Sequence, residues 1–203
     1  MIEMPTDQGK HTGWRRPASL ETPGAIIAGG HANVLAGVEL FRRAADAESA
    51  PQLVVFAAGR AKYLEEEPLE LSEGSVYAEE FRRRTEPRSA GVDIIVVRDN
   101  RNTRDDAASF LHHARQRGMR NLAVITVQVH LERTAEFFRQ LEPNAKTRLA
   151  LIAAEDVLAQ RYQHRDRFHA EHEAIRASDA YERTAAMEAI GLAKLRSGTY
   201  ELR

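Results

Sequence analysis

Two side chains able to act on an anion, His130 and Arg133, lie three residues apart at the start of an expected helix. Residues at this spacing share one face of a helix, so the imidazole and the guanidinium would be presented together. Imidazole transfers protons readily, and a guanidinium pairs with phosphate or carboxylate. The pair, with Thr126 before it at the end of an apolar run, predicts acid–base chemistry on an anionic substrate. The alternative is a surface histidine beside an arginine that pairs with Glu136 or with an acid of the C-terminal tail.

A second polar loop, which holds Asn102, Thr103 and Asp105, follows the apolar run 92–97. As a binding loop, Asn102 and Thr103 would hold the substrate by hydrogen bonds, and Asp105 would orient His130 or activate water. As a structural loop, the same residues would stabilise the start of the next helix, because Asn or Thr caps the first turn and acidic side chains there interact favourably with the helix dipole. The sequence leaves both interpretations open.

The first two apolar runs each end in glycine: the first in Gly29-Gly30 and the second in Gly59, which Arg60 follows. Glycine lets the backbone come close to a ligand, and the N–H groups at the start of a helix suit an anion. We therefore expect these glycines and Asn33 to contact the substrate, with Arg60 supplying countercharge. The alternative is a tight strand-to-helix turn that needs glycine only for its own geometry.

The predicted loop 59–74 is rich in acidic residues. Glu73 near its end, and Glu79 just beyond it, are the ones that could bring a carboxylate opposite His130. The alternative is an ordinary solvated loop. A histidine-rich stretch of the tail has the residue types of a metal site, but its neighbours are those of a charged, solvated helix. The sequence therefore predicts no metal there. The tail residues concerned are His164, His169, Glu171, His172 and Glu173.

The candidate residues need a scaffold, and the sequence predicts alternating strands and helices. The expected strands are 24–30, 52–58, 92–97, 122–127 and 148–153, and the expected helices between them are 33–47, 75–85, 103–117 and 130–141. Unbroken Val, Ile and Leu runs indicate strands buried on both faces, which is typical of parallel sheets with helical crossovers. The predicted fold class is α/β, a three-layer Rossmann-like sheet of about five mainly parallel strands with a helical C-terminal tail. Its strand ends are the usual ligand-binding edge.

The same pattern divides the chain into three segments. Residues 1–23 are polar and interrupted by proline and glycine, which predicts an irregular N-terminal arm. Residues 24–154 are expected to form the α/β domain. Residues 155–203 are helical and highly charged, which predicts an extension that packs on the domain and could also cap the site.

Composition excludes several classes of protein. The 29 Lys+Arg against 30 Asp+Glu give a net charge of -1, which argues against a nucleic-acid partner. The absence of cysteine excludes disulfides and thiolate ligands and fits a cytoplasmic location. No apolar run approaches the roughly 20 residues that cross a bilayer, so we expect no membrane insertion. The charged tail allows a homodimer without demanding one.

Familiar cofactor signatures are missing as well. No Gly-x-Gly-x-x-Gly follows the first expected strand, and the chain has no Gly-Lys-Ser/Thr phosphate loop. A standard dinucleotide-dependent dehydrogenase or nucleoside-triphosphatase is therefore disfavoured, and the cofactor is left open.

Five short motifs, taken together, resemble the YdcF/SanA/ElyC-like family of bacterial proteins, a domain of unknown function. The resemblance covers about residues 24–141 and implies an α/β fold with a polar site at the strand ends. Many members of that family carry N-terminal membrane helices and are linked to envelope biogenesis. The resemblance therefore implies a role in the cell envelope for this chain. The motifs are IIAGG at 26–30, AAGR at 57–60, SVYAEEF at 75–81, NTRDDA at 102–107 and TVQVHLERTA at 126–135.

The chain departs from the family pattern at three of these motifs. Ala58 and Arg60 flank the one glycine of the second motif, and Val127 replaces a serine after the fourth strand. Asp105 and Asp106 stand where the family has Glu and Asn, so the carboxylate is shorter and a second charge appears. The changed loops indicate a specialised substrate.

The residues favour an enzyme that acts on a small anionic, phosphate-bearing substrate by hydrolysis or group transfer. A phosphosugar, a nucleotide or a lipid-carrier head group would each fit. One alternative is a non-catalytic binding module for a nucleotide-like metabolite such as S-adenosylmethionine. Another is a structural protein whose charged tail makes the contacts.

Overall fold

The structure is a computed structural model and describes residues 30–57, 72–100, 102–144, 146–164, 170, 173 and 176–200. The predicted arm 1–23 and the strand part 24–29 lie outside these residues. The elements are α2 (Gly30–Asp46), β1 (Leu53–Ala57), α3 (Glu73–Thr85), β2 (Asp93–Val97), α4 (Thr103–Gln116), β3 (Asn121–Thr126), η3 (Gln128–His130), α5 (Leu131–Leu141), β4 (Arg148–Ala153), α6 (Ala154–Arg161) and α8 (Asp179–Arg196).

The fold is mixed α/β with short parallel strands, as predicted. β1 pairs with β2 and β3 pairs with β4, both in parallel. The described residues form two sheets of two strands, however, and not the predicted single sheet of about five strands. Within the described residues, β1 and β3 each have a ladder partner on one edge, and no backbone ladder joins the two sheets. Gly30, predicted to end the first strand, is instead the first residue of α2.

Local sequence accounts for where the elements begin. β1 and β2 are rich in β-branched residues, but most of their side chains are half-buried, whereas the sequence predicts strands buried on both faces. α3 begins two residues earlier than predicted because Ser72 caps it. The Ser72 hydroxyl accepts the N–H of Ser75 at 3.1 Å, and the Ser75 hydroxyl accepts the N–H of Ser72 at 2.9 Å. This reciprocal capping box satisfies two N–H groups that the helix cannot.

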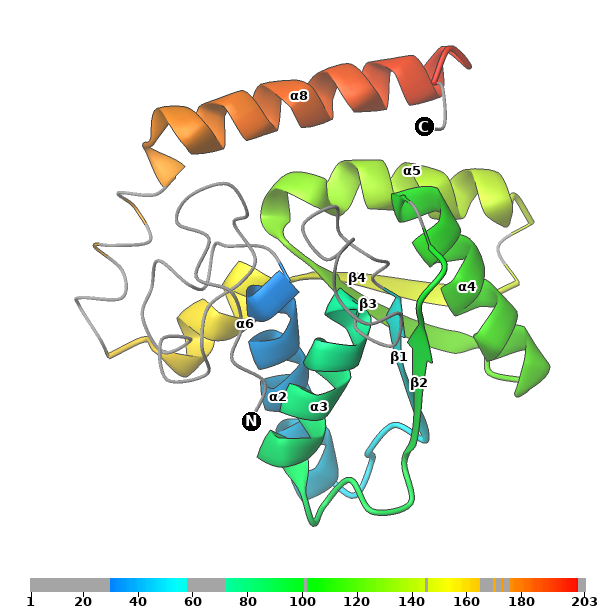
Figure 1. The fold of residues 1–203 in the computed structure, drawn as a ribbon, viewed down its shortest axis with the longest axis vertical. Helices are drawn as coiled ribbons and strands as arrows, with labels where there is room; N and C mark the ends of the chain where they lie inside the picture. The colour runs from blue at the N-terminus through cyan, green and yellow to red at the C-terminus, as the bar shows by residue number, and fades with distance from the viewer. Residues whose placement is uncertain are drawn as a thin grey trace.

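The helices gather on two sides of the strands. In Figure 1, α2, α3 and α6 lie on one side, and α4 and α5 lie on the other with α8 across α5. On the first side, Phe41 of α2 meets Phe81 of α3 edge to face at 5.3 Å between ring centroids. On the second side, Phe137 and Phe138 of α5 pack with Leu111 of α4. Each side therefore has an apolar core of its own.

The C-terminal helix is present, as predicted, and part of it is buried. Ser178 caps α8 by accepting the N–H of Tyr181 at 3.3 Å. Leu192 and Leu195 are buried, and Leu195 belongs to the same apolar cluster as Phe137. α8 is therefore attached to α5 by apolar packing as well as by charge. Among the described residues, no helix combines the length and the apolar character needed to cross a membrane.

Candidate active site

The candidate site is built on the turn that follows β3. Thr126 ends the strand opposite Ala153 of β4. Buried Val127 then anchors the chain, and its carbonyl accepts the N–H of His130 at 2.9 Å. The sequence predicts a helix from His130 onward, whereas the structure has the 3₁₀ turn η3 first and α5 from Leu131. The turn fixes the backbone of His130 at the point where strand becomes helix.

His130 and Arg133 share one carboxylate, that of Glu188 on α8. His130 Nδ1 lies 3.1 Å from Glu188 Oε1, and Arg133 Nε lies 2.7 Å from Glu188 Oε2. Glu188 is 14% exposed, Arg133 19% and His130 35%. Both contacts are within ion-pair distance. Their geometry is not that of a hydrogen bond at His130 Nδ1, Arg133 Nε or Glu188 Oε2. The cluster is therefore mostly shielded from water, with the imidazole as its most accessible member.

The contact with Glu188 affects how the imidazole can work. A carboxylate only accepts hydrogen bonds, so its position beside Nδ1 of His130 favours the tautomer with the proton on that nitrogen. Nε2 is then the nitrogen left for proton transfer with a substrate. The guanidinium and the carboxylate offset each other's charge, so the cluster has a net positive charge only when both ring nitrogens of His130 are protonated.

The tail supplies a second contact to the arginine. Arg133 Nη1 donates a hydrogen bond to the hydroxyl of Tyr200 at 3.2 Å. Gly191 of α8 lies beside the Arg133 side chain: a Cβ atom at Gly191 would be 3.6 Å from it, an ordinary van der Waals contact. The guanidinium therefore lies between α5 and the tail.

The structure also bears on the alternative interpretation of the pair. Glu136 is bound by Arg139 and Gln140 on its own helix, and those hydrogen bonds, with Arg139 first, lower the pKa of Glu136. Arg133 pairs instead with a tail acid, as the alternative allowed. That acid contacts His130 as well, so the arrangement is a three-residue cluster at a strand end and more than a surface ion pair.

A buried carboxyl group, Glu155, lies beside the same turn. It is the second residue of α6, the helix that follows β4 directly, and is 5% exposed. Its Oε2 accepts the N–H of Gln128 at 2.8 Å, which joins the start of α6 to η3. Burial raises the pKa of Glu155, and the hydrogen bonds it accepts only partly offset this. A carboxyl group with a raised pKa at a strand end is a candidate proton carrier.

The loop after β2 serves the structural role that the sequence left open. The side-chain oxygen of Asn102 accepts the N–H groups of Arg104 and Asp105, each at 3.0 Å, and so caps α4. Thr103 is the first residue of that helix. Asn102 Nδ2 also lies 3.4 Å from Asp105 Oδ2. These contacts are sufficient to explain Asn102, and a role in substrate binding stays a prediction for Asn102, Thr103 and Asp105.

The remaining predicted site residues that the structure describes lie near the starts of two helices. Gly30 begins α2, Asn33 lies one turn further along it, and Glu73 is the first residue of α3. The Asn33 side-chain oxygen is buried without a hydrogen-bond partner among the described residues. Three further predicted residues, Gly29, Gly59 and Arg60, lie outside the described residues. Within the part of the chain that the structure describes, no group of three His, Asp or Glu side chains could hold a metal.

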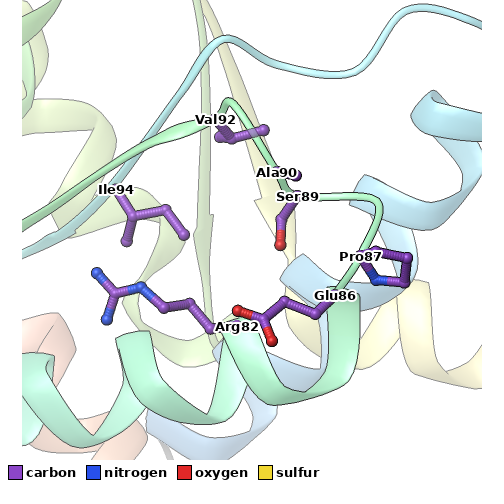
Figure 2. A pocket seen from close by; sticks show the side chains of 7 residues that line it. All are labelled: Arg82, Glu86, Pro87, Ser89, Ala90, Val92 and Ile94. Carbon is purple, nitrogen blue, oxygen red and sulfur yellow. The ribbon is translucent and has the colours of Figure 1, made fainter.

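A separate hollow of about 350 Å³ lies between the end of α3 and the loop before β2, as Figure 2 shows. Its charged side chains, Arg82 and Glu86, are exposed. It adjoins the amino end of β2, whereas His130 follows the carboxyl end of β3. We assign no chemistry to this hollow.

Sequence reasoning missed Glu188, Tyr200 and Glu155. Glu188 and Tyr200 lie 58 and 67 residues after their partners in the cluster, His130 and Arg133, and no local pattern marks them. The only signal was the expectation that the charged tail could cap the site. Glu155 lies two residues after the last expected strand, and a carboxylate at that place could have been considered.

Comparison of this chain with protein-family models, with curated proteins and with solved structures gave no match. The resemblance to the YdcF/SanA/ElyC-like family therefore stays a prediction.

Proposed function

We propose that this protein binds a small phosphate-bearing molecule beside His130 and Arg133 and acts on it by hydrolysis or group transfer. The substrate would be a phosphosugar, a nucleotide or a lipid-carrier head group. The observation that carries the proposal is the carboxylate of Glu188, which contacts both side chains at the end of a parallel strand. Strand ends of α/β sheets are where such ligands bind, and a His–carboxylate pair beside an arginine suits phosphate chemistry.

In hydrolysis of a phosphate monoester, the oxygen of water bonds to phosphorus while the bond from phosphorus to the ester oxygen breaks. His130, protonated on both ring nitrogens for this step, would give the proton on its Nε2 to the departing oxygen and keep the one on Nδ1 beside Glu188. The proton of the attacking water would pass to a carboxylate, for which Asp105 is the predicted base. Arg133 would offset the negative charge on the phosphoryl oxygens, and Glu188 would hold the imidazole in place.

Glu188 also limits how strongly the site binds an anion. Its carboxylate lies 2.7 Å from Arg133 Nε and offsets part of the guanidinium charge. An incoming phosphate must therefore use the remaining guanidinium nitrogens or displace Glu188. We expect phosphate binding to weaken as salt rises, because Arg133 and His130 are partly open to solvent.

The test is a turnover assay with p-nitrophenyl phosphate, sugar phosphates and nucleotides, in which released phosphate is measured. His130→Gln should lower kcat/KM by about 100-fold or more, which is the usual contribution of a general acid or base. His112→Gln is the matched control, because His112 is exposed on α4 and should keep the wild-type rate. Wild-type turnover by His130→Gln, with both variants folded, would contradict the proposal.

The same panel, with S-adenosylmethionine added, separates catalysis from binding. A ligand that raises the Tm but yields no product on long incubation would favour the binding-module alternative.

A further inference from the structure

The C-terminal helix α8 has apolar side chains on two opposite faces. Leu192 and Leu195 are buried, and Leu195 packs with Phe137 of α5. Met187 and Ile190 are 72% and 57% exposed, and within the described residues they are the large apolar side chains that lie open to water. A helix at the surface of a globular protein normally has one apolar stripe and a polar opposite face. The second apolar face of α8 is therefore the part of the surface that most requires a partner.

The exposed apolar face is continuous over about two turns. Met187 and Ile190 are three residues apart, so they lie on the same side of the helix. Ala186 and Ala193, both exposed, lie four residues before and three residues after Ile190. Figure 1 shows α8 running across the outside of α5, at the edge of the molecule. The small alanine side chains leave room beside Ile190 for a side chain of a partner.

The charges of α8 are divided between its two ends. Asp179 and Glu182 lie in the first turn, and Lys194 and Arg196 lie in the last turn, all four exposed. Two such helices side by side in the same direction would bring acid against acid and base against base. In opposite directions, each acidic end lies beside a basic end, and each helix dipole is opposed by the other. The exposed face is therefore complementary in charge to itself in an antiparallel pair.

We propose that a second copy of this chain docks on this face, with the two α8 helices antiparallel about a twofold axis midway between Ala186 and Ile190. In an antiparallel helix pair of this register, Ile190 lies opposite Ala186 of the second copy. Arg183 lies opposite Ala193 of the second copy, and its aliphatic stem covers that alanine. Each layer therefore pairs a large side chain with a small one, and the twofold axis repeats every contact.

Two further contacts flank these layers. On one side, Met187 meets Met187 of the second copy close to the axis. On the other side, Glu182 lies beside Arg196 of the second copy. Within its own chain, Arg196 contacts Glu132 at 3.9 Å, and these two side chains are 59% and 79% exposed. Such a long, exposed contact is too weak to hold Arg196 away from a second copy.

The length of α8 sets the strength of this dimer. Its 18 residues span about 27 Å at ~1.5 Å per residue and cover about 300 Å² at a width of ~10 Å. The two copies together then bury about 600 Å², which is less than the roughly 1,000 Å² of a stable interface. We expect a Kd of about 10–100 μM, so the chain is mostly monomeric at low micromolar concentration. The inference does not depend on the proposed function, because Glu188 lies on the opposite, inner face of α8.

The first experiment is sedimentation equilibrium of the full chain from about 5 to 500 μM, the range around the expected Kd. Wild type should show a reversible monomer–dimer equilibrium. Ile190→Ser should raise the Kd by about tenfold or more, because both copies lose their central apolar contact. Since Ile190 is 57% exposed, this variant should fold as wild type does. A wild type that stays monomeric throughout, or an unchanged Kd for Ile190→Ser, would overturn the proposal.

A charge exchange tests the direction of the helices. Glu182→Lys alone and Arg196→Glu alone should each raise the Kd by about threefold or more, because each places like charges side by side twice in the dimer. The double variant should return the Kd close to that of wild type. Glu48→Lys is the matched control, because Glu48 is exposed beyond the end of α2 and should leave the Kd unchanged. A double variant no tighter than either single variant would contradict the antiparallel pair.

Because the chain has no cysteine, single cysteines can map the contact. With a short bismaleimide, Met187→Cys should give cross-linked dimers. Arg183→Cys should not, because the two positions 183 are about 15 Å apart along antiparallel helices. Equal cross-linking of both variants would indicate parallel helices, and cross-linking of neither would show that this face is not the contact. Binding of a monomeric protein to phosphatidylserine vesicles through Ile190 would assign the face to lipid. Each of these three results would overturn the proposal.

Discussion

Replacing Glu188 with alanine tests whether α8 holds the His130–Arg133 pair in place. The variant removes the one carboxylate that contacts both side chains, at 3.1 Å and 2.7 Å. Arg133 would keep its hydrogen bond to Tyr200 but would lose its partner of opposite charge. We therefore expect a loss of stability and a loosened contact between α8 and the turn after β3.

The exposed fractions of the two side chains set the size of the loss. Exposed ion pairs contribute about 0.2–1 kcal/mol, whereas removing one partner of a fully buried pair costs about 3–5 kcal/mol. Glu188 and Arg133 are 14% and 19% exposed, so they lie between these limits. We expect Glu188→Ala to lower the free energy of unfolding by about 2 kcal/mol, which for a chain of this size is about 4–8 °C in Tm.

The assay is urea denaturation of a double-mutant cycle that combines Glu188→Ala with Arg133→Ala. The coupling energy should be about 1 kcal/mol or more. Glu182→Ala is the control, because Glu182 is exposed on the same helix and should cost no more than about 0.5 kcal/mol. A coupling energy below about 0.3 kcal/mol, the range of simple additivity, would refute the idea that the pair is held by α8.

Three other substitutions have definite expected outcomes. Burial raises the pKa of Glu155 above its value in the unfolded chain, so the free energy of unfolding of the wild type should fall as pH rises between these two pKa values. In urea denaturation, Glu155→Gln should therefore be more stable relative to wild type at pH 8 than near pH 4. Asn102→Ala should cost about 1 kcal/mol in the same assay, since it removes the cap of α4, and Asn102→Ser should restore most of it. Phe81→Ala should cost about 3–5 kcal/mol, because the ring is 2% exposed and its loss leaves a cavity; a cost below 1 kcal/mol would contradict its place in the core.

The local elements were predictable because local sequence determines them. The run RLALIA at Arg148–Ala153 is the strand with the predicted bounds, and β1 differs from its prediction by one residue at each end. Parallel pairing also followed, since a helix lies between the paired strands in sequence. α2 begins three residues before the predicted helix. The strand-like pattern 24–30 and the helix overlap at Gly30, and periodicity alone does not say where one gives way to the other.

The sheet and the site depend on contacts between distant residues, which a sequence pattern does not encode. β3 and β4 could each be predicted as a strand, but which strands share a sheet depends on pairing between residues far apart in the sequence. Likewise His130 and Arg133 could be paired by their helical spacing, whereas their partner Glu188 lies on another helix. The chemistry of the pair was therefore predictable, and its carboxylate partner was not.

The most direct test of the proposed function is the rise in Tm on titration with inorganic phosphate, with sodium chloride at matched ionic strength as reference. Wild type and Arg88→Gln should be stabilised alike, because Arg88 is exposed and pairs with exposed Asp46. Binding to the native state should add about 2.7 kcal/mol at 100 times Kd, and Arg133→Gln should lose most of that gain. If Arg133→Gln gained as much as wild type, or if phosphate stabilised none of the three proteins, a phosphate site beside His130 and Arg133 would be contradicted.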